Sequence, residues 1–534
     1  MRKKLILLGS IILLISSYII INQLQKQNFT VFNAVAEKQV QKLQRNLKEE
    51  DRLDFTALLC NEIRVPFDDA SHTFYVPLDM EDDKWERLEF LSGQPEYRIL
   101  FPEDITACDK QEAIAEGRKF PMLVFDHTSW AMYNVVFSGL PIIDLATNEG
   151  FFAEELTGTA VFYDTDFTIH GTEHSDYNAH IRGNTSRMFP KKGYKLNLTT
   201  ETKDGSTALN KLSLFGMRKD DDWMLHALYN DDTKLRDRFS MAVWDTFGAK
   251  AVSKDSYYGP RMTYVEVFAD NSYCGLYGLM ERVDAKQLNL AEEDYSYKRK
   301  NPGGLVYQYS TFFEEKNPYA EVEGFVIKDG KMTENAWSPL ADLCSLLTFS
   351  DESFLEQQTG MINEDSALRL WLFLQMITGH DHTAKNVYYV AKYNEDAQFG
   401  YEFYFAPWDL DLTWGNVSVG EVNPVYTAFE PETVDDRVYW ETGDRLLALD
   451  YHGAREKVQI LYRQLRNTVL TDDAVEEMIM GLDDQLRGSG AFARDKERWP
   501  EGVHAENCSQ LLTYAKERLA FLDKALYNLN YFVD

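Results

Sequence analysis

The residues that decide the fold lie in QMITGHDHTAKNVYYV, residues 375–390, and FGYEFYFAPWDLDLTWGN, residues 399–416. Each part contains an apolar run of strand type, at residues 387–390 and 401–406, and a polar turn separates the two. Two such runs joined by a short polar segment predict a β-hairpin. A hairpin brings the start of its first strand next to the end of its second.

Four polar side chains flank this hairpin. Asp381 and Asn386 precede its first strand, and Asp409 and Asp411 follow its second strand, so we expect all four at the same end. Carboxylate and amide oxygens are the ligands that Mg²⁺ prefers in proteins. The same residue types also form turns and cap strands, so both interpretations remain open for this stretch alone.

Length and charge limit the classes of function. A chain of 534 residues is long enough for two or three domains and a large core. Its formal net charge is −31 at pH 7. Such a surface repels phosphate backbones, which argues against a nucleic-acid partner. A nucleotide would require a local basic pocket and a cation.

The N-terminus has the pattern of a membrane-targeting segment. Arg2, Lys3 and Lys4 precede an apolar run over residues 5–21, and no small-x-small cleavage site follows. We therefore expect residues 1–25 to be an uncleaved signal anchor, with the remaining chain on the extracytoplasmic side. A cleaved signal peptide is the alternative, and it gives the same location.

Three further units are expected from the pattern of the remaining chain. A charged helical stalk is predicted at residues 26–54, followed by a small β-rich accessory domain at 55–137. The body, residues 138–534, begins with strands and one helix and becomes rich in helices from residue 366. This order predicts the α+β class.

The cysteines give no metal-binding spacing. Cys60, Cys108, Cys274, Cys344 and Cys508 form no CxxC pair, and their odd number leaves at least one thiol unpaired. Cys60 and Cys108 lie in the same N-terminal region and could form a disulfide. Cys274 and Cys344 are better interpreted as buried apolar thiols.

A basic block stands out in this acidic chain. The sequence IRGNTSRMFPKKGYKLNL, residues 181–198, combines a Gly-Asn-Thr-Ser turn with five cations. Backbone N–H groups of such a turn and nearby cations suit a polyphosphate. The GxxxxGK[ST] motif is absent, and a solvated hairpin tip is the alternative interpretation.

Six blocks in order resemble the spore coat protein H (CotH) kinase family, an atypical branch of the protein-kinase-like fold. Besides the basic block and the hairpin, they include LPIIDL, WMLHALYNDDTKLRDRFS and VEVFADNSYCGLYGLMERVD. The resemblance covers the chain from about residue 138 to its end. It implies a two-lobed kinase-like body with a β-rich N-lobe and a helix-rich C-lobe. It also implies Mg²⁺-dependent transfer of the ATP γ-phosphoryl group to Ser or Thr of a protein substrate.

The resemblance assigns roles to the residues of the hairpin. Asp381 matches the catalytic aspartate, which would orient or deprotonate the acceptor hydroxyl. Asn386 and Asp409 match the metal-holding positions. Asp411 could replace Asp409 as the Mg²⁺ ligand or act as a second one.

The resemblance also implies how the nucleotide is held. Lys195 is the preferred α/β-phosphate lysine, because its strand alternation directs it away from the apolar face, and Lys192 is its competitor. Arg182 and Ser186 would line the phosphates. Glu281, at the end of a strand, would contact adenine or serve a structural role.

Two other functions compete with this one. The chain could be a non-catalytic surface or coat protein that keeps the fold, although every expected metal and base position is filled. A glycan hydrolase could use Asp409 and Asp411 as paired carboxylates among aromatic residues. That interpretation leaves Asn386 and the basic block without a role.

Overall fold

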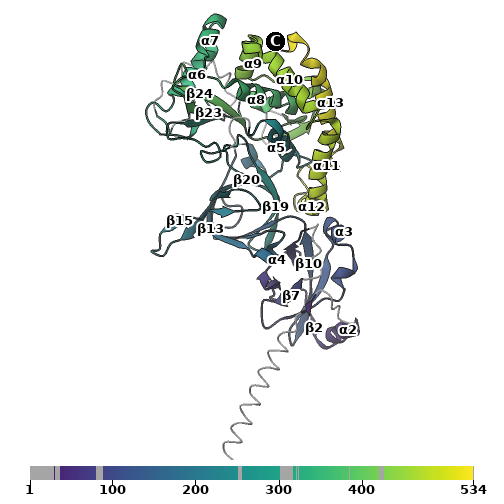
Figure 1. Ribbon diagram of the computed structural model, residues 1–534. Coiled ribbons are helices and arrows are strands. Elements are labelled where there is room, and N and C mark those ends of the chain that lie inside the picture. Colours follow the sequence, from purple (N-terminus) through teal and green to yellow (C-terminus); the bar gives the residue numbers. More distant parts are fainter. Residues whose placement is uncertain are drawn as a thin grey trace, which may run out of the picture.

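The computed structural model describes residues 29–30, 37–79, 88–183, 185–250, 255–300, 317–319, 321–322, 324–383, 385–419 and 426–532. Figure 1 shows three successive parts along this chain: two small sheets at the bottom, a larger sheet in the middle and a helix-rich part at the top. Strands and helices segregate along the sequence, which confirms the predicted α+β class.

The first part consists of two antiparallel or mixed sheets. In spatial order, one contains β1 (Phe29–Thr30), β7 (Glu89–Ser92), β3 (Leu58–Cys60) and β4 (Ile63–Arg64). The other contains β5 (Phe67–Asp68), β6 (Thr73–Pro77), β10 (Ser129–Ser138), β9 (Phe120–Phe125) and β8 (Arg98–Leu100). The short helix α3 (Lys110–Ala115) packs beside β10. The core of this part extends to Phe268 and Tyr273 of the next sheet.

The segment predicted as a stalk is only partly helical. Helix α2 (Glu37–Asn46) is followed by β2 (Lys48–Glu49), which pairs with β10. Leu43 and Leu47 pack against the buried Trp130. The end of this segment therefore lies on the first part, because its apolar residues bury there.

The predicted anchor, residues 1–25, lies outside the described residues. No helix among the residues that the structure describes combines the length and apolar character that crossing a membrane requires.

All five cysteines are free thiols, so the Cys60–Cys108 disulfide is absent. Cys60 is buried in the core of the first part, whereas the Cys108 thiol is directed to the carbonyl of Ile105, at 3.3 Å. Cys274 and Cys344 are buried, as predicted.

The middle part is a sheet that closes on itself. Its order is β13 (Glu173–Ile181), β12 (Glu155–Tyr163), β11 (Ile142–Thr147), β19 (Met262–Ala269), β20 (Ser272–Glu281), β18 (Asp222–His226), β14 (Tyr194–Glu201) and β15 (Thr207–Leu209). Because β13 also pairs with β14, every strand except β15 belongs to a ring. Leu196 and Leu198 are buried inside it, while Lys195 alternates to the outer face.

The hairpin β19–β20 illustrates how local sequence sets this sheet. Asp270 and Asn271 form its turn with φ angles of 51° and 58°. Two consecutive left-handed residues are typical of a type I′ turn, whose twist matches that of the flanking strands.

The third part combines helices with a smaller sheet. The sheet order is β22 (Phe325–Asp329), β21 (Tyr295–Arg299), β23 (Val387–Tyr393) and β24 (Tyr401–Pro407), and β25 (Asn416–Val419) pairs separately with β26 (Tyr426–Phe429). The helices are α5 (Arg236–Phe247), α6 (Ser338–Thr348), α7 (Asp351–Gln357), α8 (Glu364–Ile377), α9 (Glu441–Ala448), α10 (Ala454–Arg466), α11 (Asp472–Gly488), α12 (Ala491–Arg498) and α13 (Ser509–Ala525).

One predicted helix is two helices. A single helix over residues 445–468 is expected from the sequence, but α9 ends at Ala448 and α10 begins at Ala454. Asp450 and His452 both have φ of 48°. Left-handed residues cannot continue a right-handed helix, so the chain breaks there.

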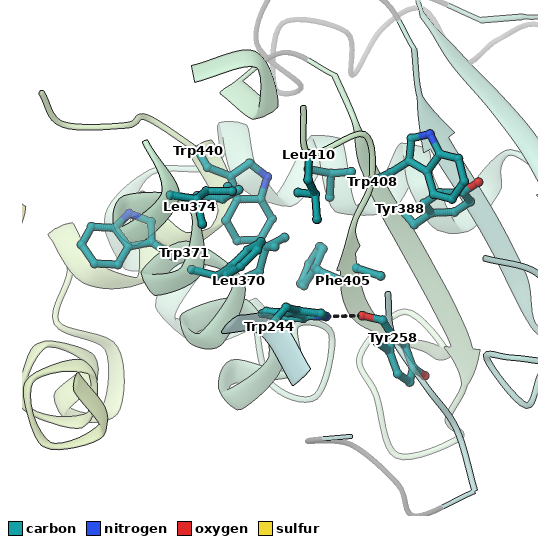
Figure 2. Close-up of a cluster of buried hydrophobic side chains, with 14 of the residues drawn as sticks. Trp244, Tyr258, Leu370, Trp371, Leu374, Tyr388, Phe405, Trp408, Leu410 and Trp440 are labelled. Atoms are coloured by element: carbon teal, nitrogen blue, oxygen red, sulfur yellow. Dashed lines mark hydrogen bonds between the residues drawn. The ribbon is translucent and has the colours of Figure 1, made fainter. Parts of the chain in front are cut away.

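The core of the third part fixes the hairpin β23–β24 to α8 and α5. Figure 2 shows Trp244 of α5, Leu370 and Trp371 of α8 and Phe405 of β24 in one cluster. The Trp244 indole donates a hydrogen bond to the backbone carbonyl of Tyr258. Helix α8 is buried on all sides over residues 370–377, which explains why the sequence there is almost entirely apolar. This packing holds in place the two loops that enter and leave the hairpin.

Candidate functional site

The loop between α8 and β23 presents Asp381 and Asn386 together. Helix α8 ends at Ile377, its C-cap residue Thr378 has a φ of 49°, and a short 3-10 helix, His380–Thr383, carries Asp381. Asn386 adopts φ of 61° just before β23. Its side-chain amide donates a hydrogen bond of 2.6 Å to the Asp381 carboxylate. The amide nitrogen is thereby engaged, and the amide oxygen is the Asn386 atom left for a cation.

The strand register brings the second acidic loop to the same place. Val387 pairs with Pro407, so Asn386 stands opposite Trp408, and the Trp408 N–H donates to the Asn386 carbonyl at 2.9 Å. The ring of His382 shares a hydrogen bond of 2.9 Å with the Trp408 carbonyl. The next residue along the chain is Asp409.

All four residues predicted to gather at this end line one cleft of about 1000 Å³, namely Asp381, Asn386, Asp409 and Asp411. The hairpin geometry accounts for this, because both loops leave the sheet at the same edge. The sequence alone was therefore sufficient to predict that these four residues lie close together.

The acidic loop also contacts the segment after β18 and the start of α5. Asn230 donates to the Asp411 carboxylate at 2.6 Å, and the Leu410 N–H donates to Asp237 at 3.1 Å. Asp237 in turn contacts the ring of His226 at 3.1 Å. Sequence reasoning missed these contributors. They all lie within WMLHALYNDDTKLRDRFS, one of the blocks quoted above for the resemblance, and that block was the available signal.

The two neighbouring carboxylates have different proton affinities. Burial raises the pKa of Asp409, but Arg182, Lys298 and other nearby cations outweigh it and hold that pKa below its usual value. Burial, together with repulsion from Asp409 and Asp237, raises the pKa of Asp411 to about 7. Asp409 is therefore the better anion of the two at neutral pH.

The opposite wall of the cleft is basic. Arg182, Ser186 and Lys195, all predicted as phosphate contacts, line it. The cleft is also lined by Arg187 of the basic block and by cations that the sequence did not single out: Arg282, Lys298, Lys300, Lys328 and Lys385. A concentration of positive charge within a chain of net charge −31 points to an anionic ligand.

The turn of the basic block is built for close approach. Arg182 follows β13, its N–H donates to the Gly193 carbonyl at 2.9 Å, and its guanidinium lies 5.9 Å from the centre of the Trp408 ring. Gly183 has φ of 97°, and a Cβ there would collide with the Ser186 hydroxyl. Only glycine therefore lets Ser186 sit beneath this turn.

The three lysines of the basic block have separate environments. Lys195 lines the cleft, with its ammonium 3.5 Å from the Asp222 carboxylate. Lys192 instead donates to the Arg187 carbonyl at 2.6 Å and is not among the described residues that line the cleft. Lys191 is fully buried and donates to Asp495 at 2.6 Å, so its role is structural.

Glu281 also lies away from the cleft lining, as far as the described residues define it. It is 1% exposed, and its carboxylate accepts a hydrogen bond of 2.9 Å from the backbone N–H of Arg218. The Arg218 guanidinium bridges to Asp284 at 2.8 Å. This environment is that of a buried residue engaged by the protein itself, as the structural alternative for Glu281 expects.

The oxygen donors fit a magnesium ion that is shared with a ligand. Within the described part of the chain, no three His, Cys, Asp or Glu side chains gather closely enough to hold a metal by themselves. Mg²⁺ in nucleotide sites usually takes one or two carboxylates and completes its shell with phosphates and water. Asn386 and Asp409, with Asp411 beside them, supply this partial set.

A second, smaller cavity of about 410 Å³ lies among Arg437, Asp444, Arg445 and their neighbours. Its charges are already paired: Arg437 contacts Asp444 at 2.5 Å, and Arg445 contacts Asp351 at 2.8 Å. It contains none of the hairpin residues, so the larger cleft is the candidate site.

The fold and the cleft thus define a mixed α+β protein whose site combines carboxylates with cations, the chemistry of a phosphate–metal ligand. A family model described as CotH kinase protein matches residues 179–522. The chain belongs to the CotH kinase family, and the matched segment contains every candidate residue named above. No curated protein matches the chain.

Proposed function

We propose that this chain is an atypical protein kinase that transfers the γ-phosphoryl group of ATP to Ser or Thr of a protein substrate, with Mg²⁺. One observation carries the proposal: oxygen donors on the hairpin and cations on the opposite wall line the same cleft, within the segment that the family model matches. In this proposal the ring of strands and the helix-rich part act as the two lobes of a kinase-like body.

Asp381 is the proposed base. Asn386 and Lys385 hold its two carboxylate oxygens, at 2.6 Å and 2.9 Å. A carboxylate fixed in this way can orient a hydroxyl and accept its proton. The hydroxyl oxygen forms the new bond to the γ-phosphorus, the bond from that phosphorus to the bridging oxygen breaks, and ADP leaves.

Asn386 and Asp409 are the proposed Mg²⁺ ligands, and Asp411 is the second candidate carboxylate. When bound, Mg²⁺ neutralises phosphate charge and orients the reacting groups. Arg182, with Lys195, would hold the phosphates from the opposite wall. These cations are in place before the ligand arrives, which reduces the cost of reorganisation.

We further propose an extracytoplasmic or spore-coat location with an anchor at residues 1–25. Residues 55–137 would form an accessory domain between the membrane and the body. The protein substrate would be a surface or coat protein or the chain itself. The formal net charge of −31 argues against nucleic acid as a partner.

Labelling with γ-³²P-ATP tests the proposal. Wild-type protein should acquire acid-stable Ser or Thr phosphate in the presence of Mg²⁺, and chelation by EDTA should abolish it. Asp381→Ala should lose the labelling. Asp396→Ala, an exposed acid in the turn of the same hairpin, is the matched control and should keep it. Equal labelling of wild type and Asp381→Ala would refute the kinase. If no label appears in any sample, a non-catalytic coat role becomes the better account.

A further inference from the structure

Lys298 lies on the wall of the cleft at a position that the sequence did not mark. It belongs to β21, and its pairing with Tyr388 on β23 places both side chains on the same face of the sheet. The Lys298 ammonium is 4.6 Å from the centre of the Trp408 ring and 5.6 Å from that of Tyr388. Figure 2 shows these two rings side by side at the edge of the core. The rings therefore hold the ammonium beside Asp409, the neighbour of Trp408.

Within the part of the chain that the structure describes, Lys298 lacks the carboxylate partner that most of the other four cleft lysines have. Three of those lysines face a carboxylate: Lys195 contacts Asp222, Lys300 contacts Glu321 and Lys385 contacts Asp381. Among the described residues, Lys298 makes no ion pair, and its ammonium instead contacts the two aromatic rings. A cation–π contact compensates a desolvated ammonium less fully than a carboxylate does.

The charged groups around Lys298 also leave its positive charge poorly compensated. Arg182, Lys300 and Lys328 line the same cleft, and their positive charges repel the Lys298 ammonium, whereas Asp409 attracts it. Lys328 is repelled in the same way by Arg282 and Lys300. A cluster of cations that repel one another in a cleft is stabilised by an anion placed among them.

We propose that Lys298, rather than Lys195, is the principal lysine that binds the non-transferred phosphates of the nucleotide. This inference rests on the proposed function and assigns a phosphate-positioning residue to the same site. Lys298 approaches the phosphates from β21 beside Asp409, while Arg182 approaches from the turn after β13. We assign Lys195 a smaller share, because its ammonium lies 3.5 Å from the Asp222 carboxylate, which it shares with Arg282.

Nucleotide binding by full-length variants tests the assignment. Titration calorimetry with MgATP should give Lys298→Met an affinity about 10- to 100-fold weaker than wild type, the effect of losing a charge-assisted contact. Adenosine has no phosphate, so its affinity should stay the same. Lys298→Arg keeps the charge and should lose less. Lys195→Met should show a smaller loss than Lys298→Met, and Lys331→Met, an exposed lysine paired with Glu292, should bind as wild type does.

A second measurement uses the wild-type protein alone and does not depend on folding of a variant. An amine-reactive reagent followed by peptide mass spectrometry should show that MgATP protects Lys298 and that adenosine does not. Unchanged MgATP affinity of Lys298→Met, or equal labelling of Lys298 with and without MgATP, overturns the assignment while the kinase can stand. If wild-type protein binds no MgATP, the proposed function and this inference fail together.

Discussion

The side-chain amide of Asn386 donates a hydrogen bond of 2.6 Å to the carboxylate of Asp381, and Lys385 contacts the other carboxylate oxygen at 2.9 Å. The proposed base is thus oriented by two neighbours from its own loop. Its position does not depend on a bound ligand. Because Asp381 is oriented within its own loop, its proposed role as base can be tested separately from the proposed role of Asp409 as a Mg²⁺ ligand.

Asp381→Asn should slow phosphoryl transfer without preventing nucleotide binding. The amide has the same shape but cannot accept the hydroxyl proton, and loss of general-base catalysis typically costs about 10²- to 10⁴-fold in rate. Single-turnover labelling should show this loss, while the Kd for MgATP, measured by calorimetry, stays within about threefold of wild type, since Asp381 is proposed to contact the acceptor. An equal loss of rate and of nucleotide affinity would argue against a role as base.

Asp409→Asn should raise the Mg²⁺ concentration needed for half-maximal labelling more than Asp411→Asn does. The cations around Asp409 keep its pKa low and the carboxylate ionised, whereas Asp411 is already engaged by Asn230 at 2.6 Å. Loss of one charged ligand should shift the Mg²⁺ dependence by roughly tenfold or more. A larger shift for Asp411→Asn would reverse the assignment of the principal ligand.

Local pattern was sufficient to predict the hairpin end of the site. The apolar runs at 387–390 and 401–406 fixed a strand pair, and the strand pair fixed the mutual position of Asn386 and Asp409. These are short-range relations, because both strands and both loops lie within about 40 residues of sequence.

The basic wall required contacts between distant segments, which no local pattern determines. Lys191, Lys192 and Lys195 look alike in the sequence, but the first pairs with Asp495, the second with a backbone carbonyl and the third with Asp222. Lys298 reaches the cleft only because β21 pairs with β23, and no pattern in the sequence around Lys298 predicts that pairing. The pairing of β13 with β14, which closes the ring of strands, likewise determines where Arg182 and Lys195 lie.

The Lys191–Asp495 pair should be a strong contributor to stability. Lys191→Met leaves the Asp495 carboxylate buried without its cation, which typically costs about 3–5 kcal/mol. Urea denaturation should show this loss in the free energy of unfolding. Adding Asp495→Asn should recover part of it, because the unpaired charge is removed while the side-chain oxygen can still accept from the Leu276 N–H. Lys192→Met is the matched control on the adjacent residue and should change stability by less than about 0.5 kcal/mol. Equal losses for both lysines would contradict the structural role of Lys191.

Lys234 should make stability rise with pH above 8. This lysine is 1% exposed, and burial, with repulsion from Lys191, lowers its pKa from 10.5 to about 8, although Asp495 and Asp231 partly offset this. Between pH 8 and 10.5 the unfolded chain therefore binds more protons at this residue than the folded chain does, and the free energy of unfolding rises with pH. Lys234→Met cannot titrate, so the wild type should gain stability relative to it by on the order of 3 kcal/mol as the lysine loses its proton. Denaturant unfolding of both proteins at several pH values from 7 to 10 measures this difference, and other titrating groups cancel in the comparison. Lys331→Met, at an exposed lysine, should show no such trend, and a flat difference for Lys234→Met would show that the buried ammonium keeps its ordinary proton affinity.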